Sequence, residues 1–300
     1  MIVMSWKTAG KIAVTSGLML YLVSKLDVNT IYEIFTQIDL VLLTLSLPFI
    51  VLMYLIKARK WQALLGCIDV EIPIKRSLEI ILIGTFYGAL TPGRAGEVSR
   101  AFYLDTEKSR SIPTVIMDRT VDAICLLILS VLSTALFFKD RTLIYLMILV
   151  VLLFITGIII TMNERTVTFA FKSFSQGKEY TENYMKTIRE ITGNKKALFF
   201  VFSLTLGYYI LNLLVYWIVI KSLSPALNNI LTFSLPIVVI LGNLPISISG
   251  FGVREFASVT IFKMLNENSA YGFTCPVVLY LLTSLSPALF GFLFTLKKKP

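Results

Sequence analysis

The feature that most constrains this chain is the length of its apolar runs. Residues 142–162 contain no charged side chain and are numerous enough to cross a bilayer, which takes about 20 apolar residues. Similar runs recur along the sequence, and 56% of its residues are hydrophobic, more than a soluble domain contains. The short alternating segments of a transmembrane β-barrel are absent. The sequence therefore predicts an all-α, polytopic integral membrane protein forming one transmembrane domain over residues 1–300.

Six of the apolar runs are predicted to be full spans. They cover residues 12–26, 40–56, 113–138, 142–162, 197–220 and 275–296. The second run leads into Lys57, Arg59, Lys60 and Trp61, a combination typical of a membrane–water interface, so we expect an interfacial anchor there.

Two further runs, 78–90 and 230–244, are too short to span and end in glycine-rich breaks. The first break, residues 90–100, contains Pro92, and the second covers residues 245–255. Proline lacks a backbone donor and glycine favours turns, so neither break continues a helix. Irregular backbone at membrane depth is tolerated only against protein or water. We therefore expect two re-entrant broken helices that enter from opposite sides, as in an inverted repeat with a site near the midplane.

Both breaks carry charged residues, and an ion at the bilayer centre costs from ~3 to more than ~10 kcal/mol. The charges must therefore pair with one another or line a polar cavity. Paired charges would lock helices together, whereas a cavity of arginines and half-helix amino termini would bind a phosphate. Both interpretations stay open. The candidate lipid- and phosphate-binding residues are Arg94, Glu97, Arg100, Arg119, Arg254 and Glu255, supported by Gly93, Gly96, Asp118, Asp122, Gly250 and Gly252.

Lysine and arginine are distributed unevenly between the predicted loops. With the amino terminus in the cytoplasm and two re-entrant breaks, most basic residues fall on the cytoplasmic side. The few that would lie outside are Lys25, Lys139, Arg141, Lys221 and Lys263. By the positive-inside rule this predicts a multi-pass protein of the cell membrane with both termini in the cytoplasm.

The most polar stretch, residues 163–196, has an apolar stripe. Tyr180, Tyr184, Ile188 and Ile191 recur at helical spacing among lysines and glutamates. This pattern predicts a cytoplasmic amphipathic segment that lies on the membrane surface and attracts anionic lipid.

Several function classes are disfavoured by composition. The chain has no histidine, which excludes Ser-His-Asp and Cys-His catalysis and most zinc sites. Cys67, Cys125 and Cys275 are far apart and form no CxxC pair, so we expect neither a disulfide nor a metal site. The net charge of +10 is explained by basic loops rather than by nucleic-acid binding. We expect no cofactor and no catalytic residue.

Three motifs together resemble a known family. Residues 90–97 with Arg100, then Asp118-Arg119, then residues 250–255 are similar to the lysylphosphatidylglycerol synthase transmembrane (flippase-like) family. In the bacterial multiple peptide resistance factor, such a membrane part moves an aminoacylated lipid between leaflets, and a separate soluble domain makes that lipid. The resemblance implies a stand-alone membrane part, and we expect no synthase domain beyond Pro300.

We therefore expect a flippase or transporter of a phosphate-bearing lipid, either a phospholipid or a polyprenyl-phosphate-linked lipid. Its partners would be membrane lipids and a separately encoded lipid synthase or glycosyltransferase. One alternative is a membrane-embedded transferase in which Glu97, Asp118 or Glu255 acts as a general base or metal ligand. Another is a membrane partner of a separately encoded lipid-modifying enzyme.

Overall fold

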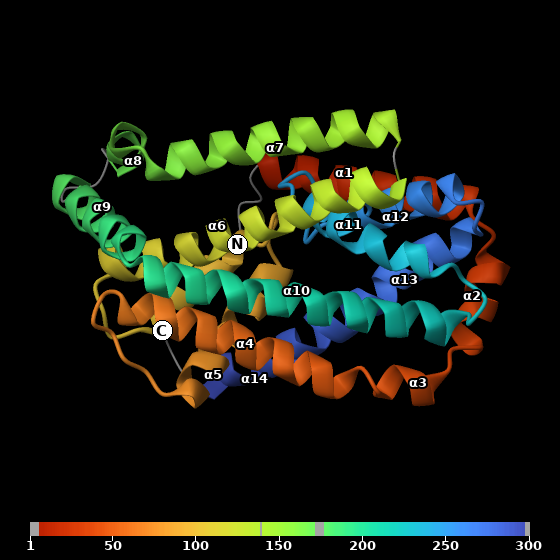
Figure 1. Cartoon of the computed structure of the whole chain (residues 1–300), viewed down its shortest axis with the longest axis horizontal. Coiled ribbons are helices and arrows are strands. Elements are labelled where there is room, and N and C mark those ends of the chain that lie inside the picture. Colours follow the sequence, from red (N-terminus) through yellow and green to blue (C-terminus); the bar gives the residue numbers. More distant parts are fainter. Residues whose placement is uncertain (1–5, 139, 172–176, 298–300) are drawn as a thin grey trace.

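Long helices make up most of this protein (Figure 1). The computed structural model describes residues 6–138, 140–171 and 177–297. Within these ranges, five helical stretches are long and apolar enough to cross a membrane: Leu40–Gly66, Lys108–Phe138, Arg141–Met162, Lys195–Leu223 and Ser269–Lys297. The predicted all-α, polytopic membrane class is therefore confirmed.

The elements follow one another with short connections. In chain order they are α1 (Trp6–Lys25), α2 (Val28–Thr36), α3 (Leu40–Thr44), α4 (Leu47–Gly66), α5 (Ile74–Ala89), the 3-10 helix η1 (Ala95–Tyr103), α6 (Lys108–Ser133), the π-turn η2 (Thr134–Phe138), α7 (Arg141–Met162), α8 (Glu164–Phe171), α9 (Gly177–Gly193), α10 (Lys195–Leu223), the 3-10 helix η3 (Asn229–Ser234), α11 (Leu235–Gly242), α12 (Val253–Met264), α13 (Ser269–Tyr280), the π-turn η4 (Leu281–Leu285) and α14 (Ser286–Lys297).

Several predicted spans differ from the observed helices, and those at 40–56 and 275–296 are longer, covering Leu40–Gly66 and Ser269–Lys297. The run at 12–26 corresponds to α1, whose apolar part, Ala13–Lys25, is shorter than the five long stretches. The run at 113–138 begins earlier, because α6 starts at Lys108 and contains Pro113 in its second turn. Pro113 is the sixth residue of α6, so it removes one interior hydrogen bond of the helix, and α6 continues through it. The earlier start places Asp118 and Asp122 well inside the helix, and both side chains are buried.

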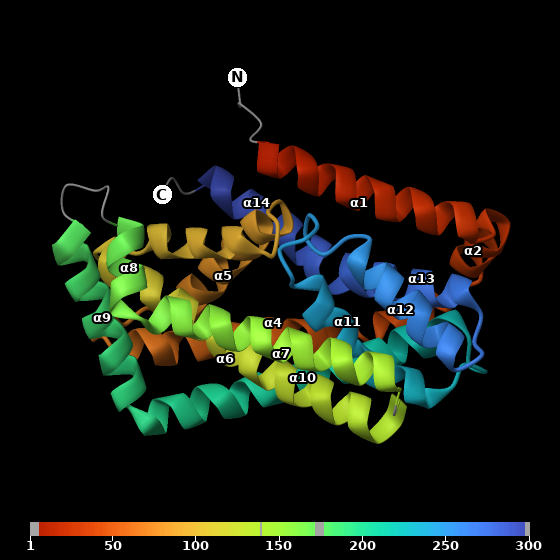
Figure 2. The same cartoon turned by 90° about the horizontal axis from the view of Figure 1, so that it is seen from above.

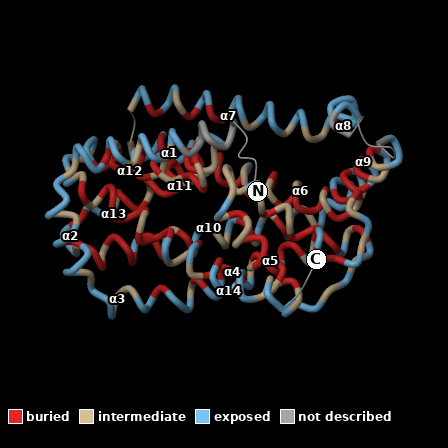
Figure 3. The backbone as a smooth tube through the Cα atoms, turned by 180° about the vertical axis from the view of Figure 1, so that it is seen from behind, coloured by how far each residue is buried: buried red, intermediate tan, exposed pale blue. Residues whose placement is uncertain are grey.

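The burial pattern is that of a protein surrounded by lipid. Helix α7 exposes apolar side chains along most of its length, including Ile148, Leu152 and Ile159, and buries few (Figure 3). Charged side chains such as Glu97, Arg100 and Asp118 are instead buried in the interior. Charges at membrane depth are expected to face the bundle interior for this reason.

Two helical hairpins enter the bundle from opposite ends. The first consists of α5 and η1, and the second consists of η3, α11 and the returning α12 (Figures 1 and 2). Their tips meet in the middle, where Pro92 and Ile248 form an isolated antiparallel bridge. Long helices α4 and α10 precede the two hairpins and pack side by side while running in opposite directions. This arrangement agrees with the predicted inverted repeat of re-entrant elements.

The last long stretch, α13 to α14, lies against both hairpins through two glycines. A Cβ at Gly272 would lie 2.8 Å from the Cα atom of Val259 in α12, and a Cβ at Gly291 would lie 2.0 Å from the carbonyl oxygen of Leu82 in α5. Small residues allow helix backbones to approach closely in a membrane. The π-turn η4 lies between these two contacts, beside the tips of the hairpins.

The polar segment after α7 folds into α8 and α9, and its apolar stripe does not face lipid. Tyr184, Ile188 and Ile191 are buried, and α9 packs against α6. The expectation that this stripe faces lipid is therefore wrong for these three residues, and Tyr180 is half-buried. An apolar stripe at helical spacing can be buried either in lipid or against a neighbouring helix, and here α6 supplies the apolar surface.

Candidate functional site

The first break is held by one threonine. The Thr91 hydroxyl donates to the carbonyl oxygen of Tyr87 at 3.0 Å and accepts from the Gly96 N–H at 2.7 Å. It therefore ties the end of α5 to the start of η1. A Cβ at Gly96 would lie 2.2 Å from the Tyr87 carbonyl oxygen, so only glycine fits between the two backbones. The turn itself uses left-handed backbone at Gly93 and Arg94, with φ of 58° and 57°.

The second break has the same kind of construction. Gly250 and Gly252 have φ of 79° and 83°, and a Cβ at Gly250 would lie 2.5 Å from the Gly242 carbonyl oxygen. Glu255 is fully buried, and its Oε2 accepts from the Gly252 N–H at 2.6 Å, which caps the start of α12. In both breaks the glycines are required by positive φ or by close backbone approach.

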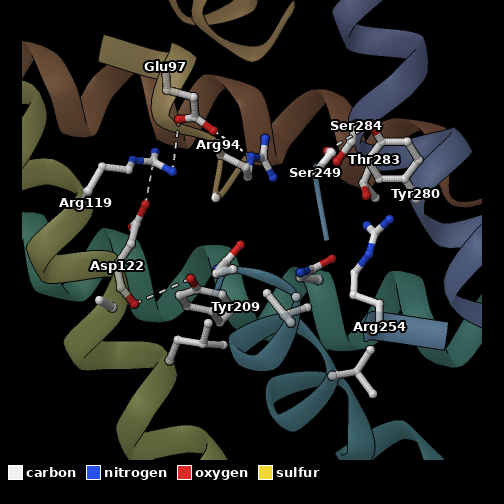
Figure 4. A pocket seen from close by; sticks show the side chains of 18 of the residues that line it. Arg94, Glu97, Arg119, Asp122, Tyr209, Ser249, Arg254, Tyr280, Thr283 and Ser284 are labelled. Carbon is white, nitrogen blue, oxygen red and sulfur yellow. Dashed lines mark hydrogen bonds and ion pairs between the residues drawn. The ribbon is translucent and has the colours of Figure 1, made fainter. Parts of the chain in front are cut away.

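A chain of ion pairs joins the first break to α6. Arg94 Nε lies 2.7 Å from Glu97 Oε1, and Arg119 Nη1 lies 2.9 Å from Glu97 Oε2. Arg119 Nη2 also lies 3.1 Å from Asp122 Oδ2. Figure 4 shows these four side chains in a row along one side of a cavity. Glu97 is thus shared by arginines from its own break and from α6, which fixes the tip of the first hairpin.

A second group of charges lies behind this row. Asp118 Oδ2 lies 2.5 Å from Arg100 Nη2, and Asp118 Oδ1 lies 2.9 Å from Lys60 Nζ. Lys60 also pairs with Asp122. The Arg100 guanidinium lies 4.9 Å from the ring centroid of Trp61, a cation–π contact. These residues are buried and hold α4, η1 and α6 together.

The predicted interfacial anchor at the end of α4 is therefore wrong for three of its four residues. Lys57, Lys60 and Trp61 are buried, and the Trp61 indole N–H donates to Thr114 Oγ1 at 3.2 Å. Arg59 is exposed. The pattern of basic residues followed by tryptophan is the same for an anchor and for a buried network, and only the facing residues of α6 distinguish them.

The hairpin tips enclose a polar cavity of about 250 Å³ (Figure 4). Six of the predicted site residues line it: Gly93, Arg94, Glu97, Arg119, Asp122 and Arg254. The other six, which are Gly96, Arg100, Asp118, Gly250, Gly252 and Glu255, do not line it. Arg100 and Asp118 belong to the buried group behind the cavity, and the expectation that Glu255 faces the cavity is wrong because its carboxylate caps α12.

The sequence missed several lining residues. Lys57 reaches the cavity from α4, and its Nζ lies 5.0 Å from the ring centroids of both Tyr54 and Tyr208. From η4 and the end of α13 come Tyr280, Thr283 and Ser284. These residues could have been noticed as polar side chains inside otherwise apolar spans. The sequence does not distinguish them, however, from polar side chains that only hydrogen-bond to their own helix backbone.

Arg254 enters the cavity from the opposite side to Arg94 (Figure 4). Its guanidinium is held between aromatic rings, 5.0 Å from the centroid of Phe251 and 4.4 Å from that of Tyr280. The nearest carboxylate oxygen in an ion pair is Glu255 Oε1, 3.7 Å from Nη2. Nε and Nη2 are buried without a hydrogen-bond partner among the described residues. Arginines from both breaks thus point into one space.

Backbone N–H groups at the two helix starts are already used. Glu97 N donates to the Arg94 carbonyl oxygen, and Arg254 N donates to the Gly250 carbonyl oxygen. Gly96 N and Gly252 N donate to the side chains of Thr91 and Glu255. The sequence predicted that half-helix ends would offer such groups to an anion, and these four are not free to do so. An anion in this cavity would therefore be bound mainly by side chains.

An apolar groove adjoins the polar cavity. Its volume is about 630 Å³, and it lies between α6, α7 and the second break. Five residues line both spaces: Val98, Arg119, Ala123, Phe154 and Asn243. The polar cavity and the apolar groove are thus adjacent, with Arg119 at their boundary. Among the described residues, no group of three His, Cys, Asp or Glu side chains is arranged to hold a metal ion.

Comparison with known proteins gives two findings. The model of the lysylphosphatidylglycerol synthase transmembrane region matches residues 9–291. A UPF0104 membrane protein from Methanocaldococcus jannaschii is 27% identical over 220 residues, which is 69% of this chain and 91% of that protein. Both similarities extend over most of the membrane domain described above.

Proposed function

This chain belongs to the family of the lysylphosphatidylglycerol synthase transmembrane region, and from that premise we propose that it moves a phosphate-bearing lipid across the membrane. The observation that carries the proposal is the pairing of a charged cavity with an apolar groove. Arg94 and Arg254 point into the cavity, and the groove between α6 and α7 begins beside Arg119. A lipid is an amphiphile, and these two spaces match its polar headgroup and its hydrocarbon chains.

Arginine suits the headgroup end of this site. Its planar guanidinium binds phosphate oxygens with two parallel hydrogen bonds, which a lysine does not reproduce. The inverted hairpins give the site one half-helix from each side of the bundle, a construction found where a substrate is reached alternately from two sides. The cavity lies where the two tips meet, at Pro92 and Ile248.

The transferase alternative is less well supported by the cavity's own carboxylates. Glu97 and Asp122 are the carboxylates that line it among the described residues, and each is paired with arginine. Both carboxylates are engaged in ion pairs with two cations each, so neither is left free to act as a general base on a substrate. We therefore favour transport over catalysis.

Movement of lipid in reconstituted vesicles tests the proposal. Acyl-chain-labelled lipids and a membrane-impermeant quencher would report movement between leaflets. We expect Arg94→Ala to slow movement about tenfold or more and Arg94→Lys to slow it less, because the bidentate contact is lost while the charge is kept. Arg189→Gln is the matched control, since Arg189 is an exposed arginine on α9 outside the cavity. Movement at the wild-type rate by Arg94→Ala would contradict the proposal.

We also propose that the protein lies in the cell membrane with both termini in the cytoplasm. The end of the bundle that carries α9 would then be cytoplasmic, and the end that carries α2 would be outside (Figure 1). Single cysteines at the exposed positions Asp105 and Asn228, in a chain without its native cysteines, test this orientation. We expect an impermeant thiol reagent to label Asn228→Cys in whole cells and Asp105→Cys only after lysis. The reverse pattern would overturn the orientation.

A further inference from the structure

Two cations in the cavity lack a close carboxylate partner. Lys57 is buried in α4, and its contacts are with the rings of Tyr54 and Tyr208 rather than with a carboxylate of the described chain. Among the residues that the structure describes, the carboxylate paired with Arg254 is Glu255 at 3.7 Å, and that glutamate already accepts from the Gly252 N–H. Aromatic rings hold both cations in place but do not neutralise them.

The other charges of the cavity compensate one another. Arg94 and Arg119 share Glu97, and Arg119 also pairs with Asp122. In their ionised forms the lining side chains are therefore four cations and two carboxylates, a net charge of +2. The excess comes from Lys57 and Arg254.

The buried charges behind the cavity do not change this excess. Lys60 and Arg100 face Asp118 behind the first break, and Glu255 lies beside Arg254 in the second, so these four further buried groups sum to zero charge. An uncompensated charge inside a membrane protein is costly. With all of these groups ionised, the cavity has an excess of two positive charges, which a dianionic ligand would neutralise.

We infer that the lipid carried by this protein has a dianionic headgroup, a phosphate monoester or a diphosphate. This inference rests on the proposed lipid transport. A phosphate monoester carries about −1.5 to −2 at pH 7, which matches the cavity, whereas a phosphodiester carries a single negative charge. A headgroup that bears an added amino acid, with its ammonium groups, would place further positive charge beside Lys57 and Arg254.

Short-chain lipids that differ only in headgroup charge test the inference on the purified, detergent-solubilised protein. The probes are dioctanoyl phosphatidic acid, dioctanoyl phosphatidylglycerol and inorganic phosphate, with ligand-induced thermal stabilisation as the readout. We expect phosphatidic acid to bind at least about tenfold more tightly than phosphatidylglycerol at pH 8. The preference should shrink at pH 5, where a phosphate monoester with a second pKa of about 6 is mostly a monoanion.

Substitutions of Lys57 and Arg254 test whether these two cations cause the preference for phosphatidic acid over phosphatidylglycerol. Lys57→Met and Arg254→Gln should each weaken phosphatidic acid binding about tenfold and phosphatidylglycerol binding much less. Lys57→Arg keeps the charge and should keep the preference, which separates charge loss from misfolding of Lys57→Met. Arg189→Gln, outside the cavity, should leave both affinities unchanged.

The outcomes separate this inference from the proposed function. Equal affinity for the two lipids at pH 8 would overturn the inference, and so would Arg94-dependent movement in vesicles of phosphatidylglycerol but not of phosphatidic acid. In the latter case lipid transport itself stands. Selective binding of phosphatidic acid with no movement of any lipid would retain the dianionic site and refute transport. Inorganic phosphate binding as tightly as phosphatidic acid would refute the lipid as ligand.

Discussion

The two breaks use the same backbone device but treat their charges differently. Both end a half-helix with glycines in left-handed conformation, and both carry an arginine and a glutamate. In the first break the pair is close, with Arg94 and Glu97 at 2.7 Å, and the pair extends to Arg119 in α6. In the second break Arg254 and Glu255 are 3.7 Å apart, and the glutamate caps its own helix.

This difference shows that a shared motif does not imply a shared role. The first break is cross-linked to α6 by charges, so its residues both build the bundle and line the cavity. The second break presents an arginine that rests on Phe251 and Tyr280 and keeps unused donors. We therefore expect substitutions of the charged network around the first break to affect stability, and substitution of Arg254 to affect ligand binding.

The largest effect is expected for Asp118→Ala, in the network behind the first break. Asp118 is buried and pairs with both Arg100 and Lys60, so its removal leaves Arg100 without this carboxylate partner and Lys60 with Asp122 alone. Loss of one partner of a buried ion pair costs about 3–5 kcal/mol. Thermal unfolding of the detergent-solubilised protein would measure it. An Asp118→Ala variant as stable as the wild type would show that the first break is not held by charge.

A smaller loss is expected where a glycine lies against backbone. Gly96→Ala in the first break would place a Cβ 2.2 Å from the Tyr87 carbonyl oxygen, and Gly250→Ala in the second would place one 2.5 Å from that of Gly242. We expect each to lower stability by about 1–3 kcal/mol, because the added Cβ forces apart the two backbone segments that meet there. The control is Gly207→Ala in α10, where an added Cβ meets nothing within 4 Å. Similar losses in both breaks would confirm that they share the backbone device.

Arg254→Gln and Arg119→Gln should separate the two roles. Arg254→Gln removes an arginine without a close ion pair, so we expect lipid movement to fall about tenfold while stability changes by less than about 1 kcal/mol. Arg119→Gln leaves Glu97 and Asp122 with fewer partners, so both stability and movement should fall. Lipid movement in vesicles and thermal unfolding, measured on the same preparations, would distinguish the two roles. Equal destabilisation by both variants would contradict the contrast between the breaks.

The smallest effect is expected for Glu255→Gln. The amide oxygen of glutamine can still accept from the Gly252 N–H, so the cap is kept, while the charge at the start of α12 and its 3.7 Å contact with Arg254 are lost. Such a charge contributes about 0.3–1 kcal/mol, and Glu255→Ala should cost more because the cap itself disappears. Thermal unfolding of the two variants measures the difference. Loss of lipid movement by Glu255→Gln with intact stability would make Glu255 a ligand-site residue and the two breaks more alike.

Local chemistry explains what the sequence could predict. The lengths of the apolar runs predicted the membrane class. The places where two helices break were predicted from Pro92, Gly93, Gly250 and Gly252. Placing Arg94 and Arg254 near a cavity followed from the same reasoning, because charge and broken backbone at membrane depth need a polar enclosure. Each of these inferences depends only on residues that are neighbours in the chain.

Only the tertiary structure decided which face of each helix meets protein and which meets lipid. Sequence patterns assigned Lys57, Lys60 and Trp61 to the membrane surface and the stripe of α9 to lipid, but the first three residues and most of the stripe are buried against other helices. The partners lie far away in sequence, as Lys60 and Asp122 do at a separation of 62 residues. A charge is stable inside a membrane protein only beside its counter-charge, and that proximity arises when the helices pack.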